Sequence, residues 1–380
     1  MKLIHLADLH LGKRVNEFSM LKDQEYILEQ VLSLADTQKV DGVLVAGDVF
    51  DKTVPSVEAV SLLDDFLTKL SSLHIPVYII SGNHDSPQRL SFGAHLMEGS
   101  GIYVAGEYLG EVKKVCTGDA FGPVDIYLLP FMKPAQVRAV WKEEGQEIET
   151  YQDAVSFVLQ KVQVDKEHRN VLVAHQFVAG AQVCDSEERS VGGIDQIDAS
   201  CMAGFDYVAL GHLHGPQQAG CETIRYAGTL LKYSFSEIHH HKGITLVELG
   251  EKGDVSIRMF PLKPLHEMRQ IRGSYEEITK RANYENTDTA DYMRIILTDE
   301  EDIFDAVGKL RAIYPNLMRL EYDNTRTGSC QVLQTETAAQ EKGPAEFVEE
   351  LFTMQNQKGM DEEQKTYMER LIRQVWEEDV

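Results

Sequence analysis

The chain has 380 residues, of which 61 are acidic and 37 are basic, giving a net charge of −24. Proteins that grip nucleic acid draw much of their affinity from basic residues, so this composition excludes a strong DNA binder acting alone. No apolar stretch approaches the roughly 20 residues of a membrane span, and five scattered cysteines indicate free thiols in a reducing compartment. A strand pattern begins at Lys2, so we expect no signal peptide and a cytoplasmic protein with no membrane partner.

Residues 1–135 alternate apolar, β-branched runs with amphipathic helical patterns. Runs such as 2–6 and 42–46 predict buried strands, and the spacing of apolar residues predicts helices over 26–35 and 57–73. A helix over 151–164 then leads to a strand at 170–175, and a hairpin is predicted at 243–249 and 255–260. This order indicates an α/β fold with layered sheets.

Polar residues follow five of the predicted strands, in short motifs spread over the first 214 positions. The motifs are Asp8-Leu9-His10, Gly47-Asp48, Gly82-Asn83-His84-Asp85, Ala174-His175 and Gly211-His212-Leu213-His214. Ligands of open α/β sheets bind beyond the carboxyl ends of the strands, so we expect these side chains to meet at one edge.

The residue types in these motifs predict a pair of metal ions. Seven of them offer oxygen or nitrogen and none offers a thiolate: Asp8, His10, Asp48, Asn83, His175, His212 and His214. Such donors suit Mn²⁺, Fe²⁺ or Zn²⁺. Asp48 is expected to bridge the ions through its two carboxylate oxygens, because phosphatases and nucleases hold such pairs roughly 3.5–4 Å apart. Paired dications activate water and neutralise phosphoryl charge, which predicts hydrolysis of phosphate esters.

The five motifs in this order resemble the calcineurin-like metallophosphoesterase superfamily, and several segments are similar to its SbcD family of nuclease subunits. The similar segments are 6–12, 46–51, 81–86, Tyr233-Ser234-Phe235-Ser236-Glu237, Lys242-Gly243 and Tyr314-Pro315-Asn316. The resemblance implies a four-layer α/β/β/α sandwich, followed by a small α+β capping domain and C-terminal helices.

The same resemblance implies a role for each motif residue. One ion would be held by Asp8, His10, Asp48 and His214, and the other by Asp48, Asn83, His175 and His212. His84 would be the catalytic histidine beside the ions, although a purely structural role stays open. The cofactors would be two Mn²⁺ ions, with Fe²⁺, Zn²⁺ or Mg²⁺ not excluded.

Several nearby residues have no assigned role at this point. Asp51 and Asp85 are expected to hold hydrogen bonds around the ligands. Lys13, Arg14 and Arg89 follow two of the motifs and would meet either phosphate or solvent. The run from His239 to His241 is expected to form an exposed turn near the mouth of the site, with a third metal position as the alternative.

We expect four parts along the chain. They are a metallophosphoesterase nuclease domain (1–264), a capping domain (265–323), a polar linker (324–343) and a helical partner-binding segment (344–380). A strand at 293–297, a helix at 303–314 and a strand at 317–322 are predicted for the second part, which from its residues alone could also serve dimerisation or stability.

Two C-terminal helices are predicted, the first from Pro344 and the second opened by a capping box of Asp361 with Gln364. Their apolar residues would dock on a partner or on the chain's own core. Family resemblance implies that the partner is an SbcC-type ATPase, within a heterotetramer that contains a homodimer of this chain.

The predicted function is therefore that of a DNA nuclease subunit. By resemblance it would cut double-stranded ends exonucleolytically and single-stranded or hairpin DNA endonucleolytically, in DNA repair and recombination. A phosphatase or cyclic-nucleotide phosphodiesterase would use the same metals, and a scaffold without activity is the remaining alternative.

Overall fold

The computed structural model describes residues 1–184, 187, 196–324, 348–349, 351–353 and 359–377. The chain divides into two compact units, Met1–Met268 and Arg269–Val380. In the described part of the chain, no helix has the length and apolar character needed to cross a lipid bilayer.

The first sheet has the strand order β16-β15-β1-β4-β5-β6. Its strands are β1 (Lys2–Leu6), β4 (Gly42–Ala46), β5 (Val77–Ile80), β6 (Ile102–Ala105), β15 (Gly243–Leu249) and β16 (Val255–Pro261). The first four are parallel, and β15 pairs antiparallel with β1. Val43, Leu44 and Val45 are all buried, as expected of a parallel strand that is covered on both faces.

The second sheet has the order β13-β14-β12-β9-β8-β7. Its strands are β7 (Lys113–Asp119), β8 (Gly122–Leu129), β9 (Arg169–His175), β12 (Tyr207–Gly211), β13 (Gln217–Ala219) and β14 (Cys221–Tyr226). The four central strands are parallel, while β7 and β13 form antiparallel edges.

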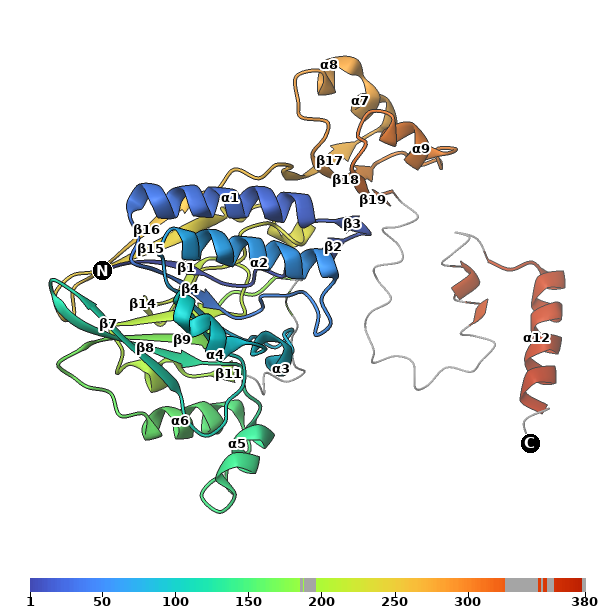
Figure 1. Cartoon of the computed structure of the whole chain (residues 1–380). Helices are drawn as coiled ribbons and strands as arrows, with labels where there is room; N and C mark the ends of the chain where they lie inside the picture. Colours follow the sequence, from blue (N-terminus) through green and yellow to red (C-terminus); the bar gives the residue numbers. More distant parts are fainter. Residues whose placement is uncertain (185–186, 188–195, 325–347, 350, 354–358, 378–380) are drawn as a thin grey trace. The chain divides into compact units, whose positions relative to one another are not determined.

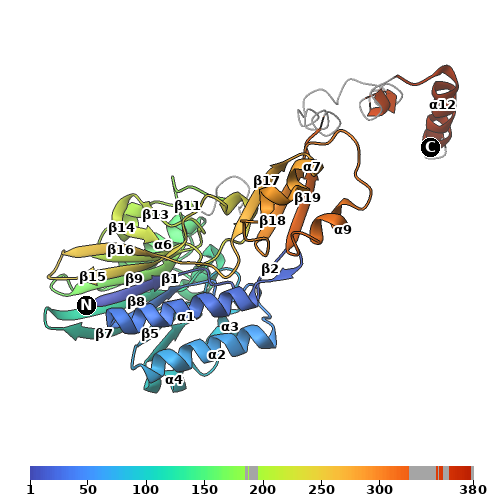
Figure 2. The ribbon, with the colours of Figure 1, turned by 90° about the horizontal axis from the view of Figure 1, so that it is seen from above.

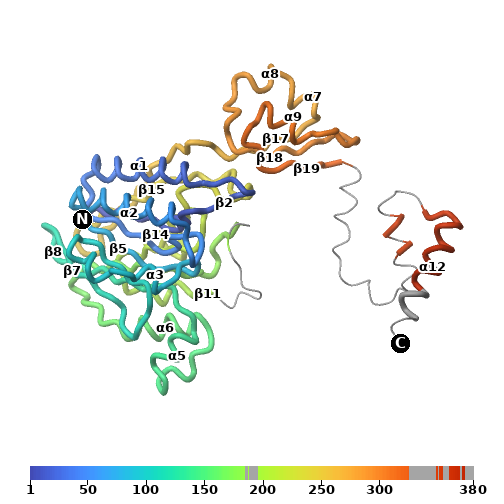
Figure 3. The backbone as a smooth tube through the Cα atoms, turned by 45° about the vertical axis from the view of Figure 1, so that its right-hand side comes forward, coloured from blue at the N-terminus to red at the C-terminus, as the bar shows by residue number. Residues whose placement is uncertain are grey.

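The two sheets pack face to face and are covered by helices on their outer faces (Figure 1). One core joins Leu44 and Tyr78 of the first sheet to Ile126, Val171 and Ala209 of the second. The helices α1 (Leu21–Gln38) and α2 (Val57–Ser72) lie side by side over the first sheet, as Figure 2 shows. On the far side, α5 (Pro134–Trp141) and α6 (Tyr151–Lys161) cover the second sheet (Figure 3). The predicted four-layer α/β/β/α sandwich is confirmed.

Shorter elements connect these layers. They are β2 (Arg14–Val15), β3 (Phe18–Ser19), α3 (Pro87–Leu90), α4 (Ala94–Met97), η1 (Glu98–Ser100), β10 (Phe177–Val178), β11 (Gln196–Ile197), η2 (Ala199–Met202) and η3 (Phe235–Glu237).

The second unit contains a three-stranded sheet with the order β17-β18-β19. Its elements are β17 (Met268–Gly273), α7 (Tyr275–Thr279), α8 (Arg281–Tyr284), β18 (Tyr292–Leu297), α9 (Ala306–Arg311) and β19 (Leu317–Tyr322). The helix predicted over 303–314 is shorter than expected. Asp305 adopts a left-handed conformation with φ 50°, which a right-handed helix cannot include, so α9 begins only at Ala306.

The described residues of the C-terminal part include two helical stretches. Residues 348–349 and 351–353 are helical, and α12 spans Glu362–Glu377. The predicted capping box is confirmed, because Gln364 N donates to Asp361 Oδ1 (2.8 Å) and Asp361 N donates to Gln364 Oε1 (3.0 Å). The predicted linker beyond Asn324 and the predicted helix start at Pro344 lie outside the described residues.

Candidate metal centre

The predicted ligands lie at the carboxyl ends of five strands that belong to two different sheets. Asp8 and His10 follow β1, Asp48 follows β4, and Asn83 follows β5, all in the first sheet. His175 ends β9, and His212 and His214 follow β12, in the second sheet. The sequence predicted a single sheet edge, whereas the structure brings together the matching edges of two facing sheets.

Glycines allow the two sheets to approach closely at this edge. A Cβ on Gly211 would lie 1.8 Å from the carbonyl oxygen of Ala46, which belongs to the opposite sheet. Gly47 has φ +85°, and a Cβ there would lie 2.4 Å from His175 Nδ1. Space therefore requires glycine at both positions, and at Gly47 the left-handed backbone conformation requires it as well.

The loops after β1 and β4 are joined by backbone hydrogen bonds. The amides of Asp8, His10 and Leu11 donate to the carbonyls of Gly47, Asp48 and Val49, over 2.9–3.1 Å. Asp8, His10, Asp48 and His212 all have positive φ. This conformation costs a non-glycine residue on the order of 1–2 kcal/mol and persists where the surroundings hold it.

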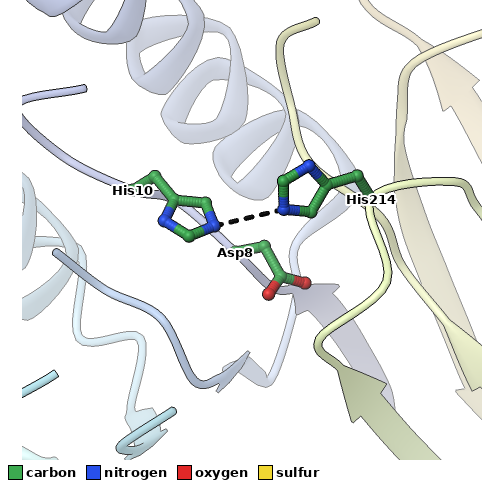
Figure 4. A group of neighbouring side chains, drawn as sticks. All are labelled: Asp8, His10 and His214. Atoms are coloured by element: carbon green, nitrogen blue, oxygen red, sulfur yellow. Dashed lines mark hydrogen bonds between the residues drawn. The ribbon is translucent and has the colours of Figure 1, made fainter. Parts of the chain in front are cut away.

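One group of donors consists of Asp8, His10 and His214 (Figure 4). Their ligand atoms lie within 4.8 Å of one another, and all three residues are buried. His10 Nε2 faces His214 Nε2 at 3.3 Å, and Asp8 lies beside the line between them. Two imidazole nitrogens and a carboxylate that converge in this way fit one divalent cation.

A second group forms around the side-chain oxygen of Asn83. Asn83 Oδ1 lies 3.0 Å from His175 Nε2 and 3.1 Å from His212 Nδ1. His175 Nδ1 donates to the carbonyl of Ala46 at 2.8 Å, which leaves Nε2 free to act as a donor to a metal.

Asp48 stands between the two groups. Its Oδ2 lies 3.8 Å from His10 Nε2 and 3.4 Å from His175 Nε2. Its Oδ1 accepts the backbone amide of His84 at 2.9 Å. The expectation that each oxygen takes one ion therefore differs from this geometry, in which Oδ2 alone faces both groups.

The electrostatics of the site fit a bound cation. Burial lowers the pKa of His10 well below its usual value and lowers that of His212 to about 3, so both rings are neutral and can donate lone pairs. Burial lowers the pKa of His175 as well, but the charge of Asp48 outweighs this effect and raises it to about 9, so a metal ion would have to displace a proton from this ring. Burial also raises the pKa of Asp8. A dication would stabilise the charged form of such a buried carboxylate.

His84, the predicted catalytic residue, borders this centre. Its Nδ1 donates to the backbone carbonyl of Asp51 at 3.2 Å, and its Nε2 lies 3.9 Å from Asp48 Oδ2. With His10 and Asp48 it also forms a group that has metal-ligand spacing.

Asp51 and Asp85 hold the hydrogen bonds that were expected of them. Asp85 accepts the amides of Val49, Phe50 and Gly82 at 2.9–3.0 Å, and burial raises its pKa to about 6. Asp51 forms an ion pair with Lys13 at 2.7 Å, so Lys13 is tied to the site.

The other unassigned residues lie outside the two groups. Arg14 and Arg89 are exposed, and Arg14 donates to the carbonyl of Glu17. His239 and His241 are exposed in a turn, as predicted, while His240 is half-buried. No group with metal-ligand spacing includes these three histidines within the described residues.

Two buried residues near the site were missed at the sequence level. Gln24 of α1 donates to the carbonyl of His10 at 2.8 Å and to the hydroxyl of Tyr233 at 2.9 Å. Tyr233 in turn donates to the carbonyl of Leu9 at 2.7 Å. Together they support the loop that carries His10. The sequence signals were a glutamine on the apolar face of α1 and the place of Tyr233 in a segment similar to the SbcD family.

The chain matches two family models and is similar to known proteins. Residues 1–216 match the family model described as "Calcineurin-like phosphoesterase", and residues 264–356 match the SbcD_C model, described as "Type 5 capsule protein repressor C-terminal domain". A dimetal phosphatase from Danio rerio is 12% identical, over 70% of this chain and 98% of that chain, with a TM-score of 0.41. A protein of Thermus thermophilus is 11% identical, over 68% and 98%, with a TM-score of 0.39.

The chain belongs to the calcineurin-like phosphoesterase family, whose fold implies a site for two metal ions. It is also 34% identical to the D subunit of the nuclease SbcCD of Staphylococcus epidermidis (strain ATCC 12228 / FDA PCI 1200) over 325 residues, which are 84% of this chain and 85% of that relative. The chain is thus a homologue of that nuclease subunit, and the resemblance to the SbcD family is confirmed.

Proposed function

We propose that the chain is a metal-dependent DNA nuclease subunit that hydrolyses phosphodiesters together with an SbcC-type ATPase. The observation that carries this proposal is the convergence of two groups of nitrogen and oxygen donors on Asp48, in a homologue of an SbcCD nuclease subunit. The proposed activities are exonuclease action on double-stranded ends and endonuclease action on single-stranded or hairpin DNA.

In this proposal Asp8, His10, Asp48 and His214 hold one ion, and Asp48, Asn83, His175 and His212 hold the other. Mn²⁺ is the proposed metal, because carboxylate, amide oxygen and imidazole suit it, as they also suit Fe²⁺ and Zn²⁺. When bound, such ions supply an activated water and neutralise phosphoryl charge. Asp48 would contribute to both positions, because its Oδ2 faces nitrogens of both donor groups while Oδ1 accepts the amide of His84.

His84 is the proposed acid for the leaving oxygen. The carbonyl of Asp51 holds its Nδ1, so Nε2 is the nitrogen that points toward the centre and can carry a proton to the substrate. General acid catalysis of this kind contributes about 10²–10⁴-fold in rate.

A partner is proposed because the chain is a poor DNA binder by charge. A net charge of −24 repels phosphates, so we assign part of the DNA binding to the ATPase. Tyr367 and Leu371 of α12 are 54% and 38% exposed, which suits an apolar docking face for a helical partner.

We further propose a homodimer within a heterotetramer, with residues 265–323 as a capping domain that shapes access of DNA. Cys116, Cys201 and Cys221 are free thiols, which fits the cytoplasm that we propose.

The proposal is tested by incubating the purified chain and Mn²⁺ with a DNA hairpin and, separately, with p-nitrophenyl phosphate. Cleavage of the hairpin that stops with chelator and returns with Mn²⁺ is the expected result. Hydrolysis of p-nitrophenyl phosphate alone, with the hairpin left intact in the presence of the ATPase, would identify a phosphatase instead. A chain that binds the ATPase but hydrolyses neither substrate would be a scaffold.

A further inference from the structure

A buried ion pair lies directly behind one of the proposed ligands. Glu237 ends η3, and Lys242 precedes β15. The carboxylate of Glu237 is fully buried, and its Oε2 lies 2.6 Å from Lys242 Nζ. Desolvating two charges is costly, so a pair like this needs further hydrogen bonds to be tolerated.

Three contacts surround His214, two from this ion pair and one from Glu187. Glu237 Oε1 lies 3.5 Å from His214 Nδ1, and Lys242 Nζ donates to the carbonyl of His214 at 2.8 Å. The amide of His214 donates to Glu187 Oε1 at 2.6 Å. The third donor of the Lys242 ammonium goes to Thr229 Oγ1 at 2.6 Å, so its capacity is filled.

The position of the Glu237 carboxylate favours one of the two tautomers of the His214 ring. An acceptor beside Nδ1 favours the tautomer that carries its proton there, and this tautomer places the lone pair of the ring on Nε2. His214 Nε2 is the atom that faces His10 Nε2 in the first donor group. A carboxylate behind a ligating histidine also raises the basicity of that ligand.

The same chain segment also supports the backbone of the loop that carries His10, the second imidazole of this group. Tyr233, four residues before Glu237, donates to the carbonyl of Leu9 and accepts from Gln24, which holds the carbonyl of His10. His175, in the other donor group, is oriented by the carbonyl of Ala46 at the end of β4. The two groups therefore have different supports.

We propose that Glu237, with Lys242, is a positioning residue for His214 and sets the affinity of one metal position separately from the other. This inference rests on the proposed function, because it takes His214 as a ligand. Supports behind metal-binding histidines change metal affinity by about 10–100-fold, so a loss in that range is expected at one position only.

The test compares two paired substitutions in the full chain. Glu237→Gln with Lys242→Met removes both buried charges together and avoids leaving one of them unpaired. Glu248→Gln with Arg258→Met removes an ion pair on the β15–β16 hairpin, where Arg258 is exposed, and serves as the matched control. Mn²⁺ binding to each is followed by calorimetric titration and by electron paramagnetic resonance, without any substrate.

The parent chain and the control are expected to bind two Mn²⁺ with the same affinities. The Glu237/Lys242 variant is expected to keep one affinity and to weaken the other about 10–100-fold. In the metal-free chain, ¹⁵N spectra of the imidazoles should show the His214 signal, identified by its loss in His214→Gln, shifting away from the Nδ1-protonated form.

Glu237→Asp decides the matter if the double variant does not fold. It keeps the negative charge beside Lys242 but withdraws the carboxylate from His214, so it should also weaken one position. Unchanged affinities in a folded Glu237 variant, or an equal loss at both positions, would overturn the inference. If the parent chain binds two Mn²⁺ ions but cleaves no DNA, that result would instead count against the proposed function alone.

Discussion

The backbone amide of His84 donates a 2.9 Å hydrogen bond to Asp48 Oδ1, and this bond determines which carboxylate oxygen faces the metal centre. Oδ2 is left within 4 Å of nitrogens from both donor groups. The amide of one motif thus orients the carboxylate of another, although the two lie 36 residues apart in sequence.

Asp48→Asn should abolish binding of both ions while the fold is retained. An asparagine can still offer Oδ1 to the His84 amide, but it then places an NH₂ group, a donor with no lone pair for a metal, where Oδ2 stood. Metal content after dialysis, read beside a thermal unfolding curve, checks this expectation. Asp65→Asn, on the exposed face of α2, is the control, and two ions per chain in the Asp48 variant would refute the bridging role.

His84→Gln should keep both ions and slow DNA cleavage by about 10²-fold or more, as expected for the loss of a general acid. Single-turnover rates at saturating Mn²⁺, with a parallel Mn²⁺ titration, separate chemistry from binding. A matching fall in Mn²⁺ affinity would make His84 a ligand or a support for one, which its spacing to His10 and Asp48 also permits.

Asp119 gives a pH dependence of stability. Arg169 Nη2 lies 2.5 Å from Asp119 Oδ1 and holds the pKa of that carboxyl well below its usual range. Because the folded-state pKa is lowered, the stabilisation is present above the unfolded-state pKa of about 3.9 and is lost as the pH falls through the folded-state value. Asp119→Asn should cost about 1–3 kcal/mol at pH 7, in the range for a hydrogen bond to a charged group.

The difference between Asp119→Asn and the parent should shrink below about pH 4, because the Asp119 carboxylate of the unfolded parent chain begins to protonate there while that of the folded chain stays charged. Urea unfolding at pH 7 and pH 3 measures both differences. Asp64→Asn, at an exposed position of α2, should show little effect at either pH. If the difference in unfolding free energy between Asp119→Asn and the parent stays constant with pH, the charge of the Asp119 carboxylate is not the source of the stabilisation.

The partner assignment is tested on α12. Replacing Tyr367 and Leu371 by glutamate places charges on exposed apolar positions, so we expect folding and Mn²⁺ binding to persist while co-purification with an SbcC-type ATPase is lost. Phe121→Glu alters an exposed aromatic residue in the β7–β8 turn and is the control. If the double variant still binds the ATPase at undiminished affinity, α12 is not part of the interface.

The residues that converge at the candidate centre were predictable because each occupies a local motif at the end of an apolar strand. Which sheet each strand joins was not, since periodicity identifies a strand but carries no information about its neighbours. The role of Glu237 was also hidden. Its partner His214 lies 23 residues earlier, and a glutamate after Phe235-Ser236 does not differ in sequence from an exposed one.

Helix ends were predictable only where a side chain marks them. Asp361 and Gln364 form the predicted capping box, and α12 begins directly after Asp361. Ile303 and Phe304 fit the helical spacing of α9 but lie outside that helix, because the left-handed turn at Asp305 has no comparable sequence signal.

The division of the donors between two sheets has a consequence for biosynthesis. Asp8 leaves the ribosome long before His212 and His214, and β1 gains its antiparallel neighbour only when residues 243–249 have been made. A nascent chain that ends before residue 211 holds Asp8, His10, Asp48, Asn83 and His175 but not the remaining two ligands. If these residues are the ligands, as proposed, phosphodiester cleavage requires most of the polypeptide to be translated and both sheets to have closed on each other. We expect this order of synthesis to act as a safeguard against cleavage by an incomplete chain. Metal-dependent cleavage by a chain truncated at residue 210 would contradict this safeguard.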